Sequence, residues 1–399
     1  MKRRDHPHKK AVYFIGIGGI GVSALARYFL SRGHKISGSD ASRSEITDQL
    51  RKEGVRILIG HKSSNISKNI DLIIHSAAIG KENSEIKKAE EFGIPLKSYA
   101  EALGELSRQY KTIAVSGAHG KSTTTAMLSL VLMKAGFDPT VIIGTKLKEF
   151  TPLAGGSNFR SGKSEYLIME ADEYHKSFLN YSPVAAIITN IDREHLDYYK
   201  NLTEIKNVFL KFINNIQFGG ILVVNKDDKN LFNLKNQIQK IGQKKNLKIY
   251  WHSIKNSQYS HIFADLNHII KVPGEHNISN ALGVYVLAKI LGAKDSVIFR
   301  ALSGYRGAWR RMEHRGQLKI KSASWRSKLK IDIYDDYAHH PTEIKATLAG
   351  IAQKWPKTAI ICVFQPHQTQ RLSALFKEFV GAFDNADVLI LLDIFKVKG

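Results

Sequence analysis

Short apolar runs alternate with amphipathic stretches along most of the chain, which predicts strands that alternate with helices. In the first part of the chain, strands are predicted at residues 11–15, 34–38, 56–59 and 72–75. The amphipathic stretch at 22–30 predicts a helix between the first two of these strands, and Gly33 marks its end. A strand–helix–strand unit of this kind places its two strands side by side and parallel.

The same alternation restarts twice farther along the chain. Strands of a second segment are predicted at residues 112–115, 140–143, 166–169, 185–189 and 220–224, and strands of a third at 332–334, 359–364 and 388–393. The restarts predict three domains, at residues 1–108, 109–309 and 310–399, so that the fold class is α/β with parallel sheets. The Lys/Gln/Asn-rich stretch around residues 243–248 is predicted to be a surface excursion.

A glycine-rich stretch with a lysine follows the predicted strand at 112–115. Residues 116–125 read SGAHGKSTTT and lead into an amphipathic segment. In a strand–loop–helix unit, the N–H groups of the loop and of the helix start bind a polyphosphate. Lys121 would contact the outer phosphates of ATP, and the Ser122 hydroxyl would bind Mg²⁺. The spacing departs from the standard phosphate loop at Val115, and the alternative is a glycine turn before an ordinary helix.

A second glycine loop, GIGGIG at residues 16–21, follows the first predicted strand. Its glycines allow the backbone to approach a diphosphate closely. Asp40, at the end of the second strand, allows a different interpretation, because an acidic residue there can bind a ribose. A nicotinamide-dependent oxidoreductase is therefore an alternative function, although it leaves the lysine-containing loop unexplained.

Acidic residues and a histidine follow two predicted strands of the second segment. Glu170 comes directly after the strand at 166–169, at the edge of a parallel sheet where ligands bind. A carboxylate near a phosphate loop is a candidate ligand of Mg²⁺, whereas Asp172 and Glu173 are typical of a first helical turn. His195 could bind a metal or a phosphate, and a structural role is equally compatible with its position.

Further polar clusters lie at a predicted helix start and after the strands of the third segment. Asn277 and Asn280 precede the apolar helix at 281–291, where their amides could face an adenine or cap the helix. The other clusters contain Asp335, Asp336, His339, His340, His367 and Arg371. These clusters are candidates for binding a ribose, a phosphate or a substrate carboxylate.

Composition narrows the class of protein. The chain has 399 residues, 43% of them hydrophobic, and contains no apolar run near the ~20 residues of a membrane span. The net charge of +23 is compatible with nucleic-acid binding, but the lysines are scattered without interleaved aromatics, and we interpret them as a solvated surface. The single cysteine, Cys362, excludes an internal disulfide, and the N-terminus lacks a secretory apolar stretch. We expect a cytoplasmic protein that binds neither nucleic acid nor membrane.

Eight motifs in one order resemble those of the Mur ligases. They read GIGGIG, SGAHGKSTTT, EADE, TNIDREH, PGEHNISNA, GAWRRME, DDYAHHPTE and FQPH followed by Arg371. The resemblance implies a Rossmann-like N-terminal domain for a UDP-sugar, a P-loop ATPase-like central domain for ATP and a Rossmann-like C-terminal domain. It implies an enzyme of peptidoglycan synthesis that uses ATP and Mg²⁺ to join L-alanine to the lactyl carboxylate of UDP-N-acetylmuramate through an acyl phosphate. Another amino acid or a peptide stays open as the substrate, and the protein is expected to be a monomer or homodimer.

The resemblance also implies site residues. For ATP these are Gly117, Ala118, His119, Gly120, Lys121, Ser122, Thr123, His276, Asn277, Asn280, Arg310 and Asp336. For the substrate we expect Gly16, Gly18, Gly19, Gly21, Ser23, Asp40, His339 and His367. The metal ligands are expected to be Ser122, Glu170 and His195, and the catalytic residues Lys121, Glu170, His195, His340 and Arg371.

The sequence departs from the pattern of the family in several places. Ala118 and Ala338 stand where Thr and Gly are common, residues 368–370 differ from the usual ones, and the basic stretch at 317–330 is expected to be a lengthened hairpin. Members of the family generally continue for several tens of residues past Asp393. We therefore expect an incomplete C-terminal domain with an exposed apolar sheet edge and weak or no activity.

Overall fold

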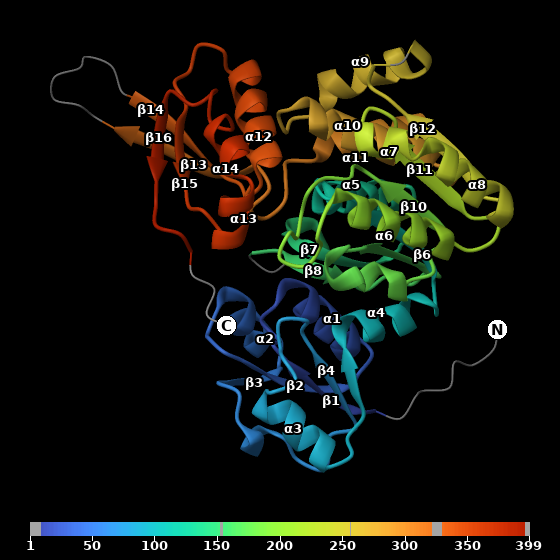
Figure 1. Ribbon diagram of the computed structural model, residues 1–399, viewed down its shortest axis with the longest axis vertical. Helices are drawn as coiled ribbons and strands as arrows, with labels where there is room; N and C mark the ends of the chain where they lie inside the picture. Colours follow the sequence, from blue (N-terminus) through green and yellow to red (C-terminus); the bar gives the residue numbers. More distant parts are fainter. Residues whose placement is uncertain (1–8, 152–154, 256, 321–328, 396–399) are drawn as a thin grey trace.

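The computed structural model describes residues 9–151, 155–255, 257–320 and 329–395, whose strands form four sheets in three units (Figure 1). The predicted α/β class is confirmed. The N-terminal unit lies below the other two in Figure 1, and the third unit lies beside the upper part of the middle unit. Among the described residues, no helix has both the length and the apolar character needed to cross a bilayer.

The N-terminal unit is a parallel five-stranded sheet with helices on both faces. Its strands are β1 (Ala11–Ile15), β2 (Lys35–Asp40), β3 (Arg56–Ile59), β4 (Leu72–His75) and β5 (Leu96–Ser98), in the order β3-β2-β1-β4-β5. Its helices are α1 (Ile20–Ser31), α2 (Glu45–Lys52), α3 (Ser84–Glu91) and α4 (Tyr99–Ser107), with the short 3₁₀ helix η1 (Ser63–Asn65). Val12 and Phe14 of β1 pack into the core under α1, whereas Tyr13 and Ile15 pack into the core with α3. This alternation follows from the two-residue period of a strand.

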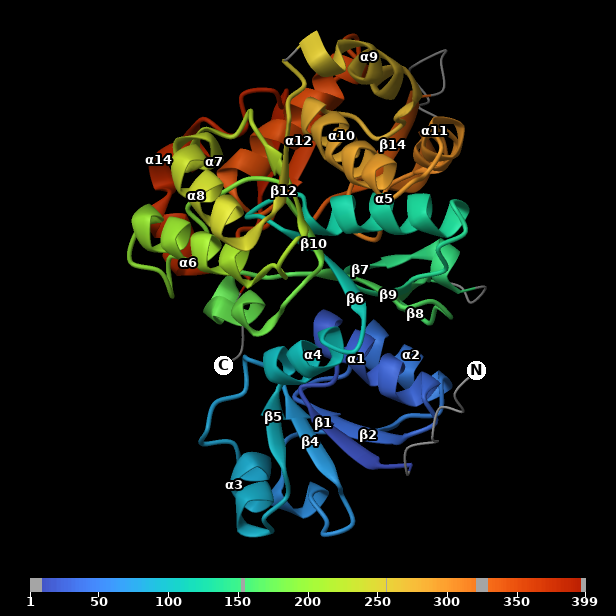
Figure 2. The ribbon, with the colours of Figure 1, turned by 90° about the vertical axis from the view of Figure 1, so that its right-hand side faces the viewer.

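The middle unit is built on a seven-stranded sheet. Its strands are β6 (Lys111–Ser116), β7 (Thr140–Leu147), β8 (Ser157–Arg160), β9 (Tyr166–Glu170), β10 (Ala185–Ile188), β11 (Ile221–Asn225) and β12 (Lys248–His252), in the order β12-β11-β10-β6-β9-β7-β8. Its longer helices are α5 (Lys121–Lys134), α6 (Leu202–Asn215), α7 (Lys229–Asn233), α8 (Lys235–Lys245), α9 (Ser260–Ile269), α10 (Glu275–Ile290) and α11 (Asp295–Gly304). The 3₁₀ helices are η2 (Lys148–Phe150), η3 (Tyr174–Asn180) and η4 (Ser257–Tyr259). Figure 2 shows α5 between the sheet and α10, which explains why its side chains are buried around most of its circumference.

Two predictions for the middle unit need correction. The stretch around residues 243–248 is not a surface excursion, because it contributes helix α8 and the edge strand β12. Ile238 and Gly242 of α8 are buried, so apolar positions inside the polar stretch dock it on the core. The sheet is also not wholly parallel, since β8 runs antiparallel to β7.

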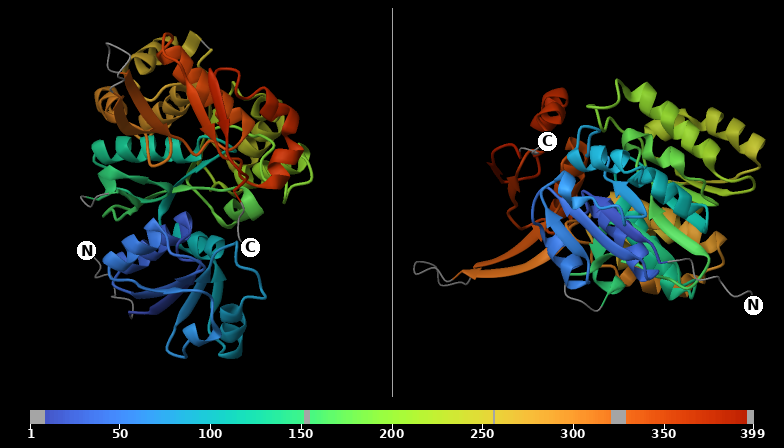
Figure 3. Two further views of the ribbon diagram at one scale, coloured as in Figure 1. Left: turned by 90° about the vertical axis from the view of Figure 1, so that its left-hand side faces the viewer. Right: turned by 90° about the horizontal axis from the view of Figure 1, so that it is seen from below.

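The third unit contains two short sheets. An antiparallel hairpin is formed by β13 (Glu313–Ile320) and β14 (Leu329–Asp335), and a parallel pair by β15 (Ile361–Phe364) and β16 (Val388–Leu391). Its helices are α12 (Pro341–Lys354), α13 (Thr369–Ala374) and α14 (Phe376–Val380). The antiparallel pair β13–β14, which projects from the molecule in Figure 3, departs from the parallel sheets of the predicted fold class but agrees with the hairpin expected at 317–330. The stretch predicted as a lengthened hairpin includes residues 321–328, which lie outside the described residues.

The parallel pair of the third unit leaves apolar side chains in contact with solvent. Val363 of β15 is 59% exposed, and Leu391 of β16 is 62% exposed. Every residue of β16 is exposed, in contrast to the buried strand β10 of the middle unit. The structure thus confirms the predicted exposure of apolar strand residues, while the predicted weak activity stays a prediction.

Candidate active site

The phosphate loop lies at the end of the central strand β6. Gly117 and Gly120 have φ angles of 141° and 81°, which other residues adopt only with strain. A Cβ atom on Gly117 would lie 2.0 Å from Oγ1 of Thr189, and one on Gly120 would lie 2.9 Å from Nδ2 of Asn280. The loop leads into α5, whose first turn has no side-chain cap. The N–H groups of this turn are therefore left to bind an anion.

Lys121 is the first residue of α5, and its ammonium group points back to the phosphate loop. Its Nζ donates to the carbonyl of Gly117 at 2.7 Å and lies 2.9 Å from Oε2 of Glu173. Burial alone would lower the pKa of Lys121, but the carboxylates of Glu173 and Asp172 raise it above its ordinary value. Burial raises the pKa of Glu173 to about 7, against the opposing effect of Lys121. The loop thus carries a fixed positive charge, and its counter-ion is a carboxyl group that can take up a proton near neutral pH.

Ser122 and Glu170 lie together, as the prediction of a Mg²⁺ site requires. The Ser122 hydroxyl donates to Oε2 of Glu170 at 3.2 Å, and Oε1 accepts the N–H of Gly144 at 2.6 Å. Burial raises the pKa of Glu170, against the opposing effect of the Gly144 N–H. A hydroxyl beside a carboxylate supplies the hard oxygen ligands that Mg²⁺ takes in proteins. These two residues fit the predicted metal.

His195 contacts a different pair of carboxylates. Its Nε2 lies 3.6 Å from Oε1 of Glu173 and 4.0 Å from Oδ1 of Asp172, and its ring stacks on that of Tyr174 at 4.4 Å. Burial lowers the pKa of His195, against the opposing effect of Asp172. The structure therefore places His195 with Asp172 and Glu173 in a group of potential metal ligands, and not against Glu170.

A cavity of about 430 Å³ opens beside the loop, between the middle and third units. This volume suits a small-molecule ligand. Of the residues expected to bind ATP, the cavity is lined by His119, Gly120, Ser122, Thr123, His276, Asn277, Asn280 and Asp336. Arg311 lines the cavity as well, whereas Arg310 does not. The exposed side chain of Arg310 lies over the rings of Tyr337 and Trp309, at 4.9 and 5.6 Å.

Two polar side chains that line the cavity, those of Asn277 and Asp336, also form hydrogen bonds with the backbone of the protein. Asn277 donates through Nδ2 to the carbonyl of Pro273 at 2.7 Å, so its amide holds the turn that precedes α10. Asp336 accepts N–H groups of Met312 at 3.2 Å and Ala338 at 2.9 Å. Burial raises the pKa of Asp336 to about 6, although Arg311 lowers it. Asp336 thus anchors the start of the third unit at the wall of the cavity.

Histidines and an arginine of the third unit approach the loop that follows β10. Nη2 of Arg371 donates to Oε2 of Glu194 at 3.0 Å, and Nε2 of His339 lies 3.9 Å from Oε1 of the same carboxylate. The ring of His367 lies 6.5 Å from that of His339. His340 caps α12, because its side chain accepts the N–H of Thr342 in the first turn. Its ring lies 4.8 Å from the ring of His119 in the phosphate loop. Arg371 and His339 therefore gather around Glu194, and His367 lies behind His339.

The glycine loop of the N-terminal unit bonds its own N–H groups at residues 16–19 within the protein and leaves those of the first turn of α1 for an anion. Gly16 has a φ angle of 78°, and the N–H of Gly18 donates to Oδ2 of Asp40 at 2.8 Å. Helix α1 begins at Ile20, and its N-cap Gly19 provides no side-chain cap. A Cβ atom on Gly21 would lie 2.9 Å from the Tyr99 hydroxyl oxygen. Residues 16–23 include no lysine or arginine. The loop itself therefore supplies no cationic side chain to an anion bound here.

Ser23 departs from the expected role in substrate binding. Its side chain is fully buried, donates to the carbonyl of Ile20 at 3.0 Å and accepts Nδ2 of Asn158 at 2.8 Å. Asn158 belongs to β8 of the middle unit, and it also accepts a hydrogen bond from Arg27 of α1. Ser23 therefore packs the N-terminal unit against the middle unit instead of facing the open side of the loop.

Several charged residues of the site were not singled out by the sequence. They are Asp192, Glu194 and Glu343, together with Glu173, which was interpreted as part of a helix start. Each stands within one of the recognised motifs, next to or near an assigned residue. A charged residue inside a motif was the available sign of a functional role. The partner of each charge could not be read from the sequence, because it lies far away along the chain: Lys121 contacts Glu173, and His119 contacts Asp192.

Comparisons with known proteins agree along the whole chain. Three family models match it: "Mur ligase family, catalytic domain" at residues 11–111, "Mur ligase middle domain" at 115–288 and "Mur ligase, glutamate ligase domain" at 314–396. A UDP-N-acetylmuramate–L-alanine ligase from Clostridium kluyveri is 43% identical, over 99% of this chain and 85% of that protein. The protein of the same name from Clostridium perfringens is 40% identical, over 98% of this chain and 84% of that protein.

A solved structure is similar over the same extent. The UDP-N-acetylmuramate–alanine ligase MurC from Thermotoga maritima matches with a TM-score of 0.77 and 28% identity, covering 97% of this chain and 86% of that chain. The arrangement of all three units thus has a counterpart of known structure.

Proposed function

Because this chain belongs to the Mur ligase family, we propose that it is an ATP-dependent ligase of peptidoglycan synthesis that joins L-alanine to UDP-N-acetylmuramate. The lactyl carboxylate attacks the γ-phosphate of ATP, so that ADP leaves and an acyl phosphate forms. The amine of L-alanine then attacks the acyl carbon and loses a proton, and inorganic phosphate leaves as the amide forms. Relatives at 40–43% identity favour this function over a nicotinamide-dependent oxidoreductase.

The observation that carries the proposal is the phosphate loop with Lys121 and the uncapped start of α5. Phosphoryl transfer demands positioning and neutralisation of charge more than covalent chemistry from the protein. The N–H groups of α5 would hold phosphate oxygens, and Lys121 would exchange its partner Glu173 for the outer phosphates. Glu173 could then take up a proton, because its pKa is raised to about 7 by burial, although Lys121 lowers it.

Ser122 and Glu170 would hold Mg²⁺, which when bound supplies positive charge to the transferring phosphoryl group. His195 stays a proposed metal-site residue through its contacts with Asp172 and Glu173. His276 and Asn280, at the cavity beside the loop, are proposed to contact the nucleotide.

The N-terminal unit is proposed to bind the diphosphate of the UDP-sugar. Its loop, with Gly16, Gly18, Gly19 and Gly21, leads into the uncapped first turn of α1, whose N–H groups would contact the diphosphate. His339, His367 and Arg371 of the third unit are proposed to face the reacting end of the substrate. The domain limits 1–108, 109–309 and 310–399, the cytoplasmic location and the monomeric or homodimeric state stay predictions.

A phosphate-release assay tests the function. ATP, Mg²⁺ and UDP-N-acetylmuramate are supplied with one amino acid at a time, and the product is identified by mass. Because weak activity is predicted for this chain, we expect slow release of phosphate with L-alanine, above the rate without any amino acid, and formation of the alanyl product. Release with L-alanine no faster than without any amino acid, from protein that binds ATP, would contradict the proposal.

A further inference from the structure

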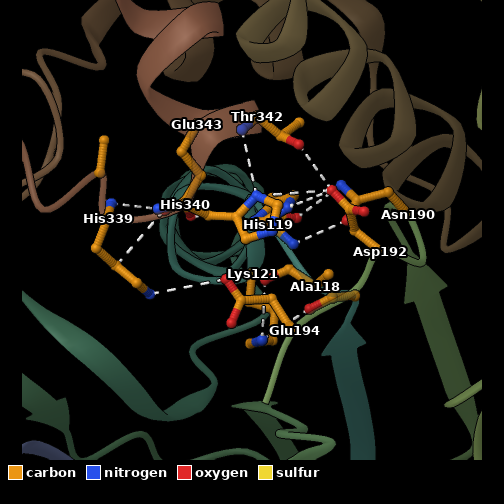
Figure 4. Close-up of polar contacts among 12 residues, drawn as sticks. Ala118, His119, Lys121, Asn190, Asp192, Glu194, His339, His340, Thr342 and Glu343 are labelled. Carbon is orange, nitrogen blue, oxygen red and sulfur yellow. Dashed lines mark hydrogen bonds and ion pairs between the residues drawn. The ribbon is translucent and has the colours of Figure 1, made fainter. Parts of the chain in front are cut away.

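A cluster of charged side chains joins the phosphate loop to the third unit at His119 (Figure 4). Nε2 of His119 lies 3.0 Å from Oδ2 of Asp192, which follows β10 in the middle unit. Its Nδ1 lies 3.2 Å from Oε1 of Glu343, in the first turn of α12 in the third unit. The side chains of His119 and Glu343 are only 12% and 13% exposed. The imidazole ring is thus held between two carboxylates, one from each unit.

The cluster is charged at neutral pH. Burial alone would lower the pKa of His119, but Asp192 and Glu343 raise it to about 10. Burial alone would raise the pKa of Glu343, but His119 holds it well below its ordinary value. Nε2 of His119 is hydrogen-bonded to Asp192, whereas Nδ1 lies at ion-pair distance from Glu343 without the geometry of a hydrogen bond. The protonated ring therefore bridges the two units mainly through its charge.

Glu343, which contacts His119, is also bonded to other residues of the third unit. Its Oε2 accepts the N–H of His339 at 3.1 Å, and it completes the capping box of α12 with His340. Its Oε1 also lies 4.0 Å from Nη1 of Arg311, which lines the cavity beside the loop. A change at His119 therefore reaches the start of α12 and one wall of that cavity.

The hydroxyl of Thr342 adds a second link between the same two units. Its Oγ1 donates to Oδ2 of Asp192 at 2.8 Å, the same oxygen that His119 contacts. Two side chains of different units thus share one carboxylate oxygen. The interface is specified at this point by hydrogen bonds and charge rather than by apolar packing.

We propose that His119 is a positioning residue that fixes the third unit over the phosphate loop, so that the groups of both units meet around one nucleotide. The inference rests on the proposed ATP-dependent reaction. Its physical basis is that His119, which directly precedes Gly120 and Lys121 in the phosphate loop, carries the positive charge that pairs with the carboxylate of Glu343. Loss of that charge would remove the shortest ion pair of buried Glu343, leaving His339 at 3.5 Å and Arg311 at 4.0 Å, and would favour separation of the units.

A metal ion in the same place explains the geometry less well. His119, Asp192 and His340 each offer a potential ligand atom within 4.8 Å of the others. However, Nδ1 of His340 already accepts the N–H of Thr342 at 3.2 Å, and both nitrogens of His119 face carboxylates. Protonated His119 satisfies these carboxylates without an added cation.

The test uses His119→Gln, Glu343→Gln and the double variant in the full chain. Glutamine at 119 removes the positive charge but keeps an amide donor. Glutamine at 343 removes the negative charge but remains suitable for the capping box of α12. Arg193→Gln and Glu378→Gln are matched controls, because these residues form an ion pair across the same interface while being 44% and 45% exposed.

Two measurements are made on each variant. The first is kcat and the Kd of Mg²⁺–ATP, obtained separately by phosphate release and by calorimetry. The second is the distribution of distances between spin labels on the middle and third units, at Lys244→Cys and Lys377→Cys in a Cys362→Ala background. Both lysines are exposed, and Cys362 is the single native cysteine.

We expect both single variants to lengthen and broaden the label distances and to lower kcat roughly 100-fold, with a smaller change in the Kd of ATP. The double variant should be no worse than either single one, because both remove the same contact. The control variants should resemble the parent protein.

Three results would overturn the inference: additive losses in the double variant, unchanged label distances, or a loss confined to ATP affinity in His119→Gln while Glu343→Gln behaves like the parent. A failure of the proposed function would look different. The parent protein itself would then release no phosphate with UDP-N-acetylmuramate and L-alanine, whereas the label distances would still report on the contact.

Discussion

The two glycine loops of this protein share a backbone arrangement and differ in charge. Each follows a strand whose two neighbours run parallel to it, β1 or β6, and each leads into a helix without a side-chain cap. In the first loop the N–H of Gly18 is bound to Asp40, and no lysine or arginine lies within residues 16–23. In the second, Lys121 and the carboxylates of Glu170 and Glu173 surround the helix start.

The comparison indicates how the same strand–loop–helix unit, present twice, can be adapted to two different anions, a diphosphate and a triphosphate. Backbone N–H groups at a helix start provide a general affinity for phosphate. A lysine and a pair of oxygen ligands adapt the second loop to a triphosphate with Mg²⁺, where charge moves during the reaction. The first loop lacks these groups and is suited to a diphosphate that does not react. The predictions below separate the two loops by experiment.

Loss of the lysine in the second loop should have the largest effect. Lys121→Ala should lower kcat by several hundred-fold, in line with the ~3–4 kcal/mol lost with one electrostatic contact to a developing charge. The fold should persist, because Glu173 can be protonated once its partner is gone. Rates are measured by ADP formation and folding by circular dichroism. The exposed Lys134→Ala in the last turn of the same helix is the control, and near-normal ADP formation by Lys121→Ala would refute the assignment.

Alanine substitutions at one glycine of each loop should affect different substrates. Gly120→Ala places a Cβ 2.9 Å from Nδ2 of Asn280 at a φ angle of 81°, so we expect the Kd of ATP to rise about tenfold or more. Gly18→Ala places a Cβ 2.8 Å from Oδ2 of Asp40 and should raise the KM for UDP-N-acetylmuramate instead. Calorimetry and steady-state kinetics measure the two constants. Equal effects of either variant on both substrates would contradict the division of labour.

Stability should fall with rising pH because of the charge on the second loop. The pKa of His119 is raised from its unfolded value near 6.5 to about 10, since Asp192 and Glu343 outweigh burial. A raised pKa contributes stability that is complete below pH 6.5 and is lost as the pH rises towards 10. Between pH 7.5 and 9.5 the free energy of unfolding should therefore fall, by at most about 1.4 kcal/mol per pH unit from this group.

The contribution of His119 is isolated by comparison with His119→Gln. Urea unfolding of the parent protein and of this variant is followed at several pH values in the same window. The other charged groups near the ring, Glu194 and His340 among them, are present in both proteins. The variant should show a shallower fall in stability, and parallel curves would show that His119 does not titrate as described.

The smallest effect is expected for the acidic residue of the first loop. Asp40→Asn keeps an oxygen that can accept the N–H of Gly18, and it removes one negative charge beside the proposed diphosphate site. We expect the KM for UDP-N-acetylmuramate to change by less than about fivefold, which corresponds to ~1 kcal/mol for a partly exposed charge. A much larger rise in KM would show that Asp40 itself binds the substrate, and not only the loop.

Local patterns predicted the strands well and the distant contacts poorly. Strands at 56–59 and 72–75 coincide with β3 and β4, because each is a short apolar run with polar residues on both sides. Helix α8 was missed because its few apolar positions, such as Ile238, are hidden in a polar stretch. Strand β13 was missed because Glu313–Ile320 is not an apolar run, although a hairpin was expected at 317–330.

The candidate site shows the same limit. Lys121, Ser122 and Glu170 could be chosen from the sequence because a loop and a strand end place them at one edge of a parallel sheet. Ser23 was expected at the substrate but is buried against Asn158, a contact that no local pattern contains. Glu343 contacts the phosphate loop only after the third unit has docked, so its role follows from tertiary structure.

The central claim is that the second loop binds the triphosphate and that its lysine makes this possible. Calorimetric titration of Mg²⁺–ATP into the parent protein and into Lys121→Ala tests it most directly. We predict one binding site in the parent protein and a strongly weakened or undetectable one in the variant. An absence of heat with the parent protein, or equal affinity in the two proteins, would contradict the account.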